Sequence, residues 1–191
     1  MLPYDFAALA DTLHTYKSEL KALLETRRTE AEERKAALNA NAYALTSDPR
    51  HPLAPPAALE TPPYLNFAPL ENALTALDKA AAHFSQARAE AIGKDVPAAR
   101  LKALNEELAQ AERKLTSPQG LPRRPWMQHL IYAPGWYTGY DAKTLPGPRE
   151  AIEERRYSDA DEQIARVAQA IQGESAFVEK IAGELEATSR P

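Results

Sequence analysis

The sequence predicts an all-α fold: a four-helix bundle with one proline-rich insertion after the first helix and one long aromatic loop before the last helices. Apolar residues recur at intervals of three and four over long stretches, which places them on one face of a helix. The chain is rich in alanine and has only seven glycines among its 191 residues, so few positions break a helix. Most of its sixteen prolines gather in two segments, and these separate the helical stretches.

The composition excludes several classes of protein. The formal net charge is −4 and no stripe of basic residues is present, which argues against a nucleic-acid partner. Cysteine is absent, so disulfides, thiolate nucleophiles and cysteine-bound zinc are excluded. No apolar run approaches the roughly 18 residues of a membrane-spanning helix. The first residues lack the basic and apolar regions of a signal peptide.

The first predicted helix covers about residues 4–45. Its apolar stripe is formed by Phe6, Leu9, Leu13, Tyr16, Leu20 and Leu23. Between Glu25 and Lys35, eight of eleven residues are charged. Such a run is typical of a solvated helix face, so we expect this part of the helix to project into solvent.

A proline-rich linker is predicted over residues 47–68, because proline at this density forbids helix and favours extended chain. Near its end, Tyr64, Leu65 and Phe67 are expected to pack the linker back onto the bundle. The alternative interpretation is a ligand for a proline-binding module.

Two further helices are predicted over residues 69–92 and 96–116. Gly93 suits the position after the end of the former. Asp95 suits the N-cap of the latter, with Pro97 in its first turn. Their stripes are Leu70, Leu74, Leu77, Ala81 and Phe84, and then Leu101, Leu104, Leu108, Ala111 and Leu115.

A long loop follows over residues 117–147, and a short helical turn is expected from Pro148 to Arg155. The last helix is predicted over 158–187, with Ser158 as N-cap and Asp161 completing a capping box. Its stripe is Ile164, Val167, Ile171, Val178, Ile181 and Leu185.

The residues show no catalytic or metal-binding pattern. The four histidines are scattered and none stands beside a second metal ligand, so His14, His83 and His129 are expected to be hydrogen-bonded structural residues. No nucleophile elbow and no glycine-rich phosphate loop is present. Within the long loop, Trp126, Ile131 and Tyr132 are expected to plug the end of the bundle, whereas Trp136, Tyr137 and Tyr140 are expected to be exposed.

The long loop also carries a resemblance. The series Gly120-Leu121-Pro122, Arg124-Pro125, His129, Ile131-Tyr132-Ala133-Pro134, Tyr140 and Leu145-Pro146-Gly147 resembles the C-terminal helical dimerisation domain of the glutamate carboxypeptidase II and transferrin-receptor family. The opening Leu2-Pro3-Tyr4-Asp5 and the final helix are similar as well, and bacterial zinc peptidases of the family are the better likeness.

The resemblance implies a function for the chain. Residues 1–191 would be one dimerisation domain of a zinc-dependent exopeptidase, without catalytic residues or metal ligands of its own. Two zinc ions would be held in a separate peptidase domain. The implied partners are a second copy in a homodimer, that peptidase domain and a peptide substrate, with no nucleic acid and no membrane-spanning segment.

The resemblance also implies a substrate-binding position in the loop. In the carboxypeptidase, a Lys-Tyr pair of this loop binds the C-terminal glutamate of the substrate. Here the tyrosine corresponds to Tyr140, whereas the lysine corresponds to Gly139, which has no charged group to offer. Carboxypeptidase, aminopeptidase and dipeptidase activities therefore all stay open for the parent protein.

Two alternatives to this interpretation are a receptor-like protein without peptidase activity and a free-standing helical interaction module. Members of the family usually act outside the cytoplasm, so the resemblance implies an exported, periplasmic or extracellular parent.

Overall fold

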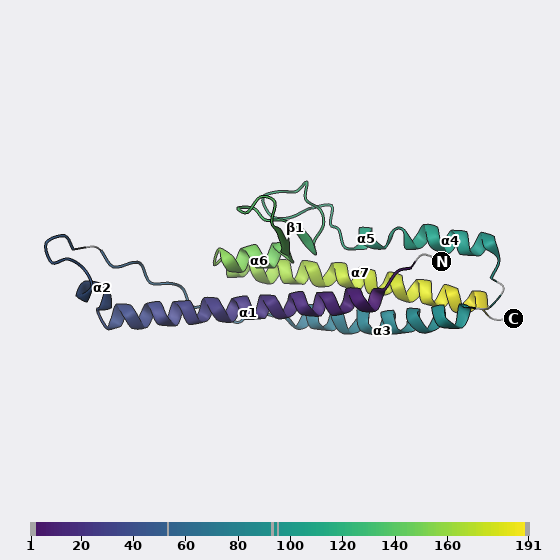
Figure 1. Ribbon diagram of the computed structural model, residues 1–191, viewed down its shortest axis with the longest axis horizontal. Helices are drawn as coiled ribbons and strands as arrows, with labels where there is room; N and C mark the ends of the chain where they lie inside the picture. The colour runs from purple at the N-terminus through teal and green to yellow at the C-terminus, as the bar shows by residue number, and fades with distance from the viewer. Residues whose placement is uncertain (1–2, 53, 93, 95, 190–191) are drawn as a thin grey trace.

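The computed structural model describes residues 3–52, 54–92, 94 and 96–189. It is mostly helical, which confirms the all-α class. Three long helices, α1 (Phe6–Asn39), α3 (Ala68–Ala91) and α7 (Tyr157–Ser189), lie along one another in an elongated body (Figure 1). Among the described residues, no helix is both long and apolar enough to cross a membrane.

The core lies mainly between α3 and α7. All members of the two predicted stripes on these helices are buried, and Leu77 and Ile171 are completely enclosed. Alanines such as Ala73 and Ala168 lie between the larger side chains, which lets the helix backbones approach closely. Phe6 of α1 joins this core through an edge-to-face contact with Phe84, with ring centroids 5.0 Å apart.

Helix α1 is shorter than predicted. The Asp5 carboxylate caps its start by accepting the Ala8 N–H at 3.0 Å. The helix ends at Asn39 because Asn41 takes a left-handed conformation with φ of 55°, and the short helix α2 (Ala42–Leu45) follows. The prediction of one continuous helix to residue 45 was therefore wrong.

The charged run of α1 is only partly solvated. Ala31 within the run is buried, and the Glu30 carboxylate bridges Arg27 and Arg155, each at 2.8 Å. Hydrogen bonds from Arg27, together with the charge of Arg155, hold the Glu30 pKa below its usual value. Beyond this point α1 and α2 extend past the other long helices (Figure 1).

The proline-rich segment returns to the bundle through Leu65 and Phe67, which are buried as predicted. Tyr64 was also expected to pack there, but its side chain is 82% exposed. The backbone N–H of Asn66 donates instead to the Asp161 carboxylate of α7 at 2.8 Å.

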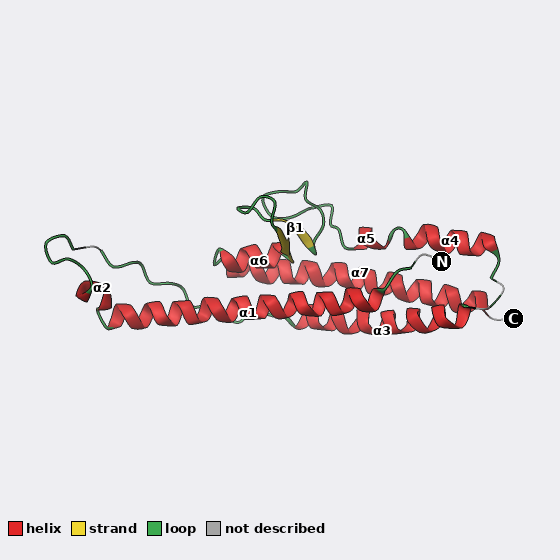
Figure 2. Ribbon diagram, viewed as in Figure 1, coloured by secondary structure: helices red, strands yellow, loops and turns green. Residues whose placement is uncertain are grey.

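The helix predicted over 96–116 is two helices, α4 (Ala98–Leu108) and α5 (Ala111–Lys114). Pro97 occupies the N-cap position of α4 rather than its first turn. Gly93 and Asp95, predicted as helix-end residues, lie outside the described residues. Three long helices therefore carry most of the packing, with α4 and α5 covering one side (Figure 2).

Helix α6 (Pro146–Glu153) precedes α7, and the chain turns between them at Arg155, where φ is 60°. Helix α7 begins at Tyr157, so Ser158 lies inside the helix and the predicted capping box does not form. The Asp161 carboxylate accepts the Asn66 backbone N–H instead.

Candidate functional site

The long loop contains two short strands that the sequence analysis missed. Strand β1 (Tyr132–Pro134) pairs antiparallel with β2 (Ala142–Thr144), so that Ala133 faces Lys143 (Figure 2). The Gly135 N–H donates to the Asp141 carbonyl at 3.0 Å and closes the end of this hairpin. Residues 135–141, which join the strands, are called the hairpin loop below.

The hairpin loop presents aromatic side chains to solvent. Tyr140 is fully exposed, Tyr137 is largely exposed, and Trp136 is exposed to a smaller degree, as predicted for all three. Gly139 takes a left-handed conformation with φ of +65°. Apart from its two chain neighbours, no described residue has an atom within 4 Å of the position that a Cβ would occupy. The two positions singled out by the resemblance therefore stand side by side at an open tip.

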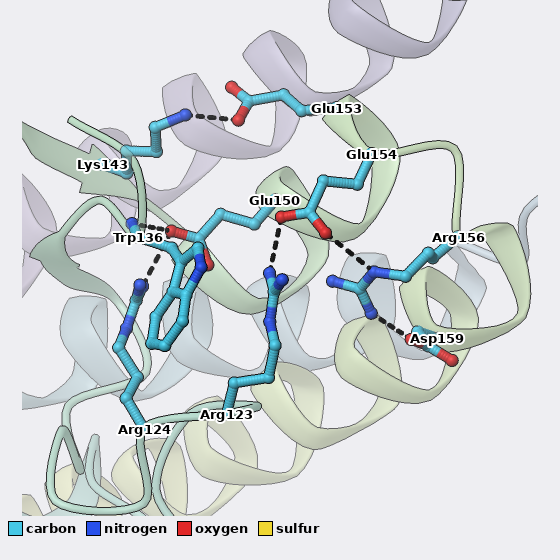
Figure 3. A network of polar contacts seen from close by, with 9 residues as sticks. All are labelled: Arg123, Arg124, Trp136, Lys143, Glu150, Glu153, Glu154, Arg156 and Asp159. Carbon is cyan, nitrogen blue, oxygen red and sulfur yellow. Dashed lines mark hydrogen bonds and ion pairs between the residues drawn. The ribbon is translucent and has the colours of Figure 1, made fainter.

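A buried ion pair anchors the hairpin loop to α6. Glu150 Oε1 accepts the Trp136 backbone N–H and Arg124 Nη2, each at 2.8 Å (Figure 3). Both charged side chains are almost completely buried. A pair enclosed in this way has strong attraction but also a high desolvation cost, and the second hydrogen bond, from the Trp136 N–H, offsets part of that cost. One carboxylate thus fixes two segments of the loop.

Arg123 contacts two of the aromatic side chains of the hairpin loop. The Arg123 guanidinium lies 5.0 Å from the ring centroid of Trp136 and 6.0 Å from that of Tyr137, within cation–π range. The same guanidinium binds Glu154 at 2.5 Å. Burial raises the pKa of Glu154, but hydrogen bonds from Arg123 and Arg156 outweigh burial and keep the pKa below its usual value.

The strands are tied to two helices. Lys143 of β2 forms an ion pair with Glu153 of α6 (Figure 3). Arg149 of α6 donates to the Thr144 carbonyl at 2.8 Å and to the Glu19 carboxylate of α1 at 2.6 Å. Contacts to both α6 and α1 therefore set the orientation of the hairpin.

The first half of the loop lies along the side of the long helices, not at an end of the bundle (Figure 1). Ile131 is buried as predicted. Trp126 is 68% exposed and Tyr132 is 50% exposed, so the prediction that they plug the bundle was wrong. Both rings carry a polar group, which allows them to lie at the surface. The Tyr132 hydroxyl donates a hydrogen bond to Glu112 at 2.6 Å.

Three histidines are hydrogen-bonded, as predicted: His14, His83 and His129. His129 Nδ1 accepts the Ile131 N–H at 3.2 Å, so Nε2 carries the proton and donates to Glu112 at 3.1 Å. Burial lowers the pKa of His129 against the pull of Glu112. His14 lies 3.0 Å from Asp78. His83 lies 2.9 Å from both Glu179 and Glu186.

The hairpin loop carries one side chain that can bind a ligand through a hydrogen bond. Its exposed Tyr140 hydroxyl can donate one hydrogen bond to a carboxylate or carbonyl. Within the described ranges, no group of three or more histidine, aspartate or glutamate side chains is placed to hold a metal ion.

Residues 65–179 match the model of the transferrin receptor-like dimerisation domain. The chain belongs to this family. The matched part of the dimerisation domain includes the hairpin, its anchor Glu150 and most of α7.

Three relatives of the dimerisation domain are named as probable glutamate carboxypeptidases. LAMP1 of Arabidopsis thaliana is 38% identical over 95 residues, covering 46% of this chain and 14% of the relative. The protein of the fungus Arthroderma benhamiae is 39% identical over 70 residues, covering 37% and 10%. VP8 of Zea mays is 36% identical over 69 residues, covering 35% and 9%. The matched stretches are thus a small fraction of each relative.

Sequence reasoning missed the pairing of Arg124 with Glu150. Arg124 belongs to the motifs that carry the family resemblance, but Glu150 stands 26 residues further along the chain and no periodic pattern links the two. A usable signal was the position of Glu150 directly before Ala151 and Ile152, where a carboxylate that faces the core needs a cationic partner.

Proposed function

We propose that this dimerisation domain belongs to a zinc-dependent exopeptidase and that its hairpin loop completes the substrate pocket of a separate peptidase domain. The domain itself is not catalytic. The observation that carries the proposal is Tyr140, fully exposed at the tip of a hairpin whose base is fixed by a buried ion pair. A rigid base with an exposed polar tip suits a residue that must reach a ligand held by another domain.

The names of the relatives support a peptidase parent, because all three are called probable glutamate carboxypeptidases. The parent's two zinc ions would be bound by its peptidase domain. In the dimer, the second copy would supply a further surface, as the family's description as a dimerisation domain suggests.

Gly139 separates this chain from a glutamate-specific pocket. It offers no ammonium group beside Tyr140, so a C-terminal glutamate would lose one charge-assisted hydrogen bond. The substrate class that we propose is therefore a peptide whose carboxylate or carbonyl is held by the Tyr140 hydroxyl alone, and carboxypeptidase, aminopeptidase and dipeptidase activities all fit.

The test is Tyr140→Phe in the full-length parent. Loss of one hydrogen bond should lower kcat/KM by a free energy of about 0.5–1.5 kcal/mol. Tyr64→Phe is the matched control, since Tyr64 is also largely exposed and lies in the proline-rich segment. The thermal stability of both variants should equal that of the original chain, because each hydroxyl faces solvent.

A second candidate function is a receptor-like or free-standing helical interaction module. The observation that favours it is the cluster of exposed aromatic side chains at Trp136, Tyr137 and Tyr140, since such residues are enriched at protein interfaces. An unchanged kcat/KM for Tyr140→Phe across several substrates, together with weaker self-association of Tyr140→Ala, would favour this module over the peptidase pocket.

A further inference from the structure

A cavity of about 320 Å³ lies away from the hairpin loop. It is bounded by the first turns of α1, by α5, by the segment around His129, and by Glu174 of α7. This volume is at the lower end of the range for sites that accept small organic groups.

Glu174 is the unusual residue of this cavity. The residue is only 1% exposed, and its Oε2 atom has no hydrogen-bond partner within the described part of the chain. A buried polar atom without a partner is costly, and native structures keep one only where a ligand, water or function accounts for it.

Two further carboxylates line the cavity and keep free acceptor capacity. Asp5 caps α1 through Ala8, and Glu112 accepts from Tyr132 and His129, yet each carboxylate has additional lone pairs. The charge of Lys114 acts on Glu174 and lowers its pKa, and the Lys114 ammonium lies 5.4 Å from the Phe177 ring centroid. The charged side chains that line the cavity are therefore acidic.

The remaining walls are aromatic and aliphatic. Tyr4, Phe6, Tyr16 and Tyr132 contribute ring surface beside the carboxylates. Carboxylates among aromatic rings complement a flat organic cation. Such a cation can stack on a ring and donate hydrogen bonds from its edge to the carboxylates.

We propose that this cavity binds the guanidinium group of an arginine side chain that a polypeptide partner presents. Guanidinium fits better than ammonium because it is planar, more weakly hydrated and able to stack on aromatic rings. The polypeptide is a further domain of the parent, and in this respect the inference rests on the proposed function. The matched stretch is only 14% of the Arabidopsis relative, so a protein of that length has further chain to place against this face. The proposal does not depend on the role of Tyr140.

Binding should be coupled to proton release. Burial, followed by the charge of Glu112, raises the pKa of Glu174 to about 8, while Lys114 acts in the opposite direction. A guanidinium favours the ionised carboxylate, so affinity should increase from pH 7 to pH 9. His129 is neutral over this interval because its pKa is lowered, and the other groups facing the site are Asp5, Glu112 and the tyrosines.

The experiment is a chemical-shift titration of the ¹⁵N-labelled 191-residue chain with N-acetyl-L-arginine amide. We expect saturable shifts at Ala111, Glu112 and Ile131, and none with N-acetyl-L-citrulline amide, which has the same shape without the charge. The lysine analogue should bind more weakly. Equal responses to the arginine and citrulline probes, or shifts confined to other regions, would overturn the proposal.

Three variants complete the test. Glu174→Gln should weaken binding by about 10- to 100-fold, the range for a hydrogen bond to a charged group, and should remove the dependence on pH. Glu162→Gln, at an exposed position of the same helix, should bind as the original chain does. Thr12→Trp keeps every carboxylate but narrows the cavity, so it should also reduce binding. Unchanged affinity in Glu174→Gln, with an unchanged amide spectrum elsewhere, would contradict the proposal.

Discussion

At the residue scale, Glu150 is the point on which the candidate site depends. Its carboxylate accepts hydrogen bonds from Arg124 and from the Trp136 backbone, and its side chain is only 7% exposed. Arg124 Nε and Nη1 have no hydrogen-bond partner among the described residues. The bond from Nη2 to Glu150 therefore provides most of the stabilisation of this buried positive charge. Removing the carboxylate leaves that charge uncompensated, which costs more than the intact pair contributes.

We therefore expect Glu150→Ala to destabilise the chain by about 3–5 kcal/mol in urea-unfolding measurements. Glu150→Gln keeps an acceptor for Trp136 and should cost less. Glu153→Gln is the control on the same helix, because its ion pair with Lys143 is partly exposed and should contribute at most about 1 kcal/mol. Equal losses for Glu150→Ala and Glu153→Gln would show that the buried pair does not anchor the hairpin.

The candidate site was partly predictable at this scale. Tyr140 stands beside Gly139 in a segment without an apolar stripe, and exposure followed from that context. The positions of Trp126 and Tyr132 were not predictable from hydrophobicity, because an aromatic ring with a polar group can lie at the surface. The Arg124–Glu150 contact depends on tertiary folding, which no local pattern reports.

At the scale of elements, the long helices were predictable because each buries one side, and the apolar residues on that side recur at helical spacing. The stripes of α3 and α7 are buried at every predicted position. The predicted ends of helices were wrong where local backbone geometry sets them. The left-handed conformation of Asn41 ends α1, and Ser158 lies inside α7 instead of before it. The three-residue strands are too short to produce a visible alternation of apolar and polar residues.

The far end of α1 should be the least protected part of the long helices. No residue from Glu32 to Asn39 is buried, whereas α3 and α7 bury side chains along their length. Local opening there costs few contacts, so its amides should exchange with deuterium roughly 100-fold faster than those around Leu77. Native-state hydrogen exchange with mass spectrometry provides the measurement. Similar protection in both regions would indicate that a partner or a second copy covers the projecting end.

At the scale of the whole molecule, membership of a dimerisation-domain family predicts reversible self-association. Sedimentation equilibrium should show a mass that rises from 21.0 kDa towards twice that value as concentration increases. The unfolding temperature should rise over the same interval, because association stabilises only the folded state. A mass that stays at 21.0 kDa to about 100 μM, with a constant unfolding temperature, would mean that this chain alone does not dimerise.

The pH dependence of stability is also a property of the whole fold. Burial raises the pKa of Glu174 from 4.5 to about 8, so the folded state retains a proton that the unfolded chain has released. Stability from this group is complete below pH 4.5 and is lost as the pH rises to about 8. His83 acts in the same direction, because Glu186 and Glu179 raise its pKa, although its exposure reduces the effect. His129 acts in the opposite direction, because its pKa is lowered.

We expect the free energy of unfolding to fall by up to about 4 kcal/mol between pH 5 and pH 8, with Glu174 as the main source. Urea unfolding at several pH values measures this. Glu174→Gln cannot ionise, so its stability should vary much less and should exceed that of the original chain at pH 8. His83→Gln should retain most of the slope, because the exposed ion pairs of His83 contribute little. A pH dependence that persists in Glu174→Gln and disappears in His83→Gln would contradict this assignment and would make His83 the main source.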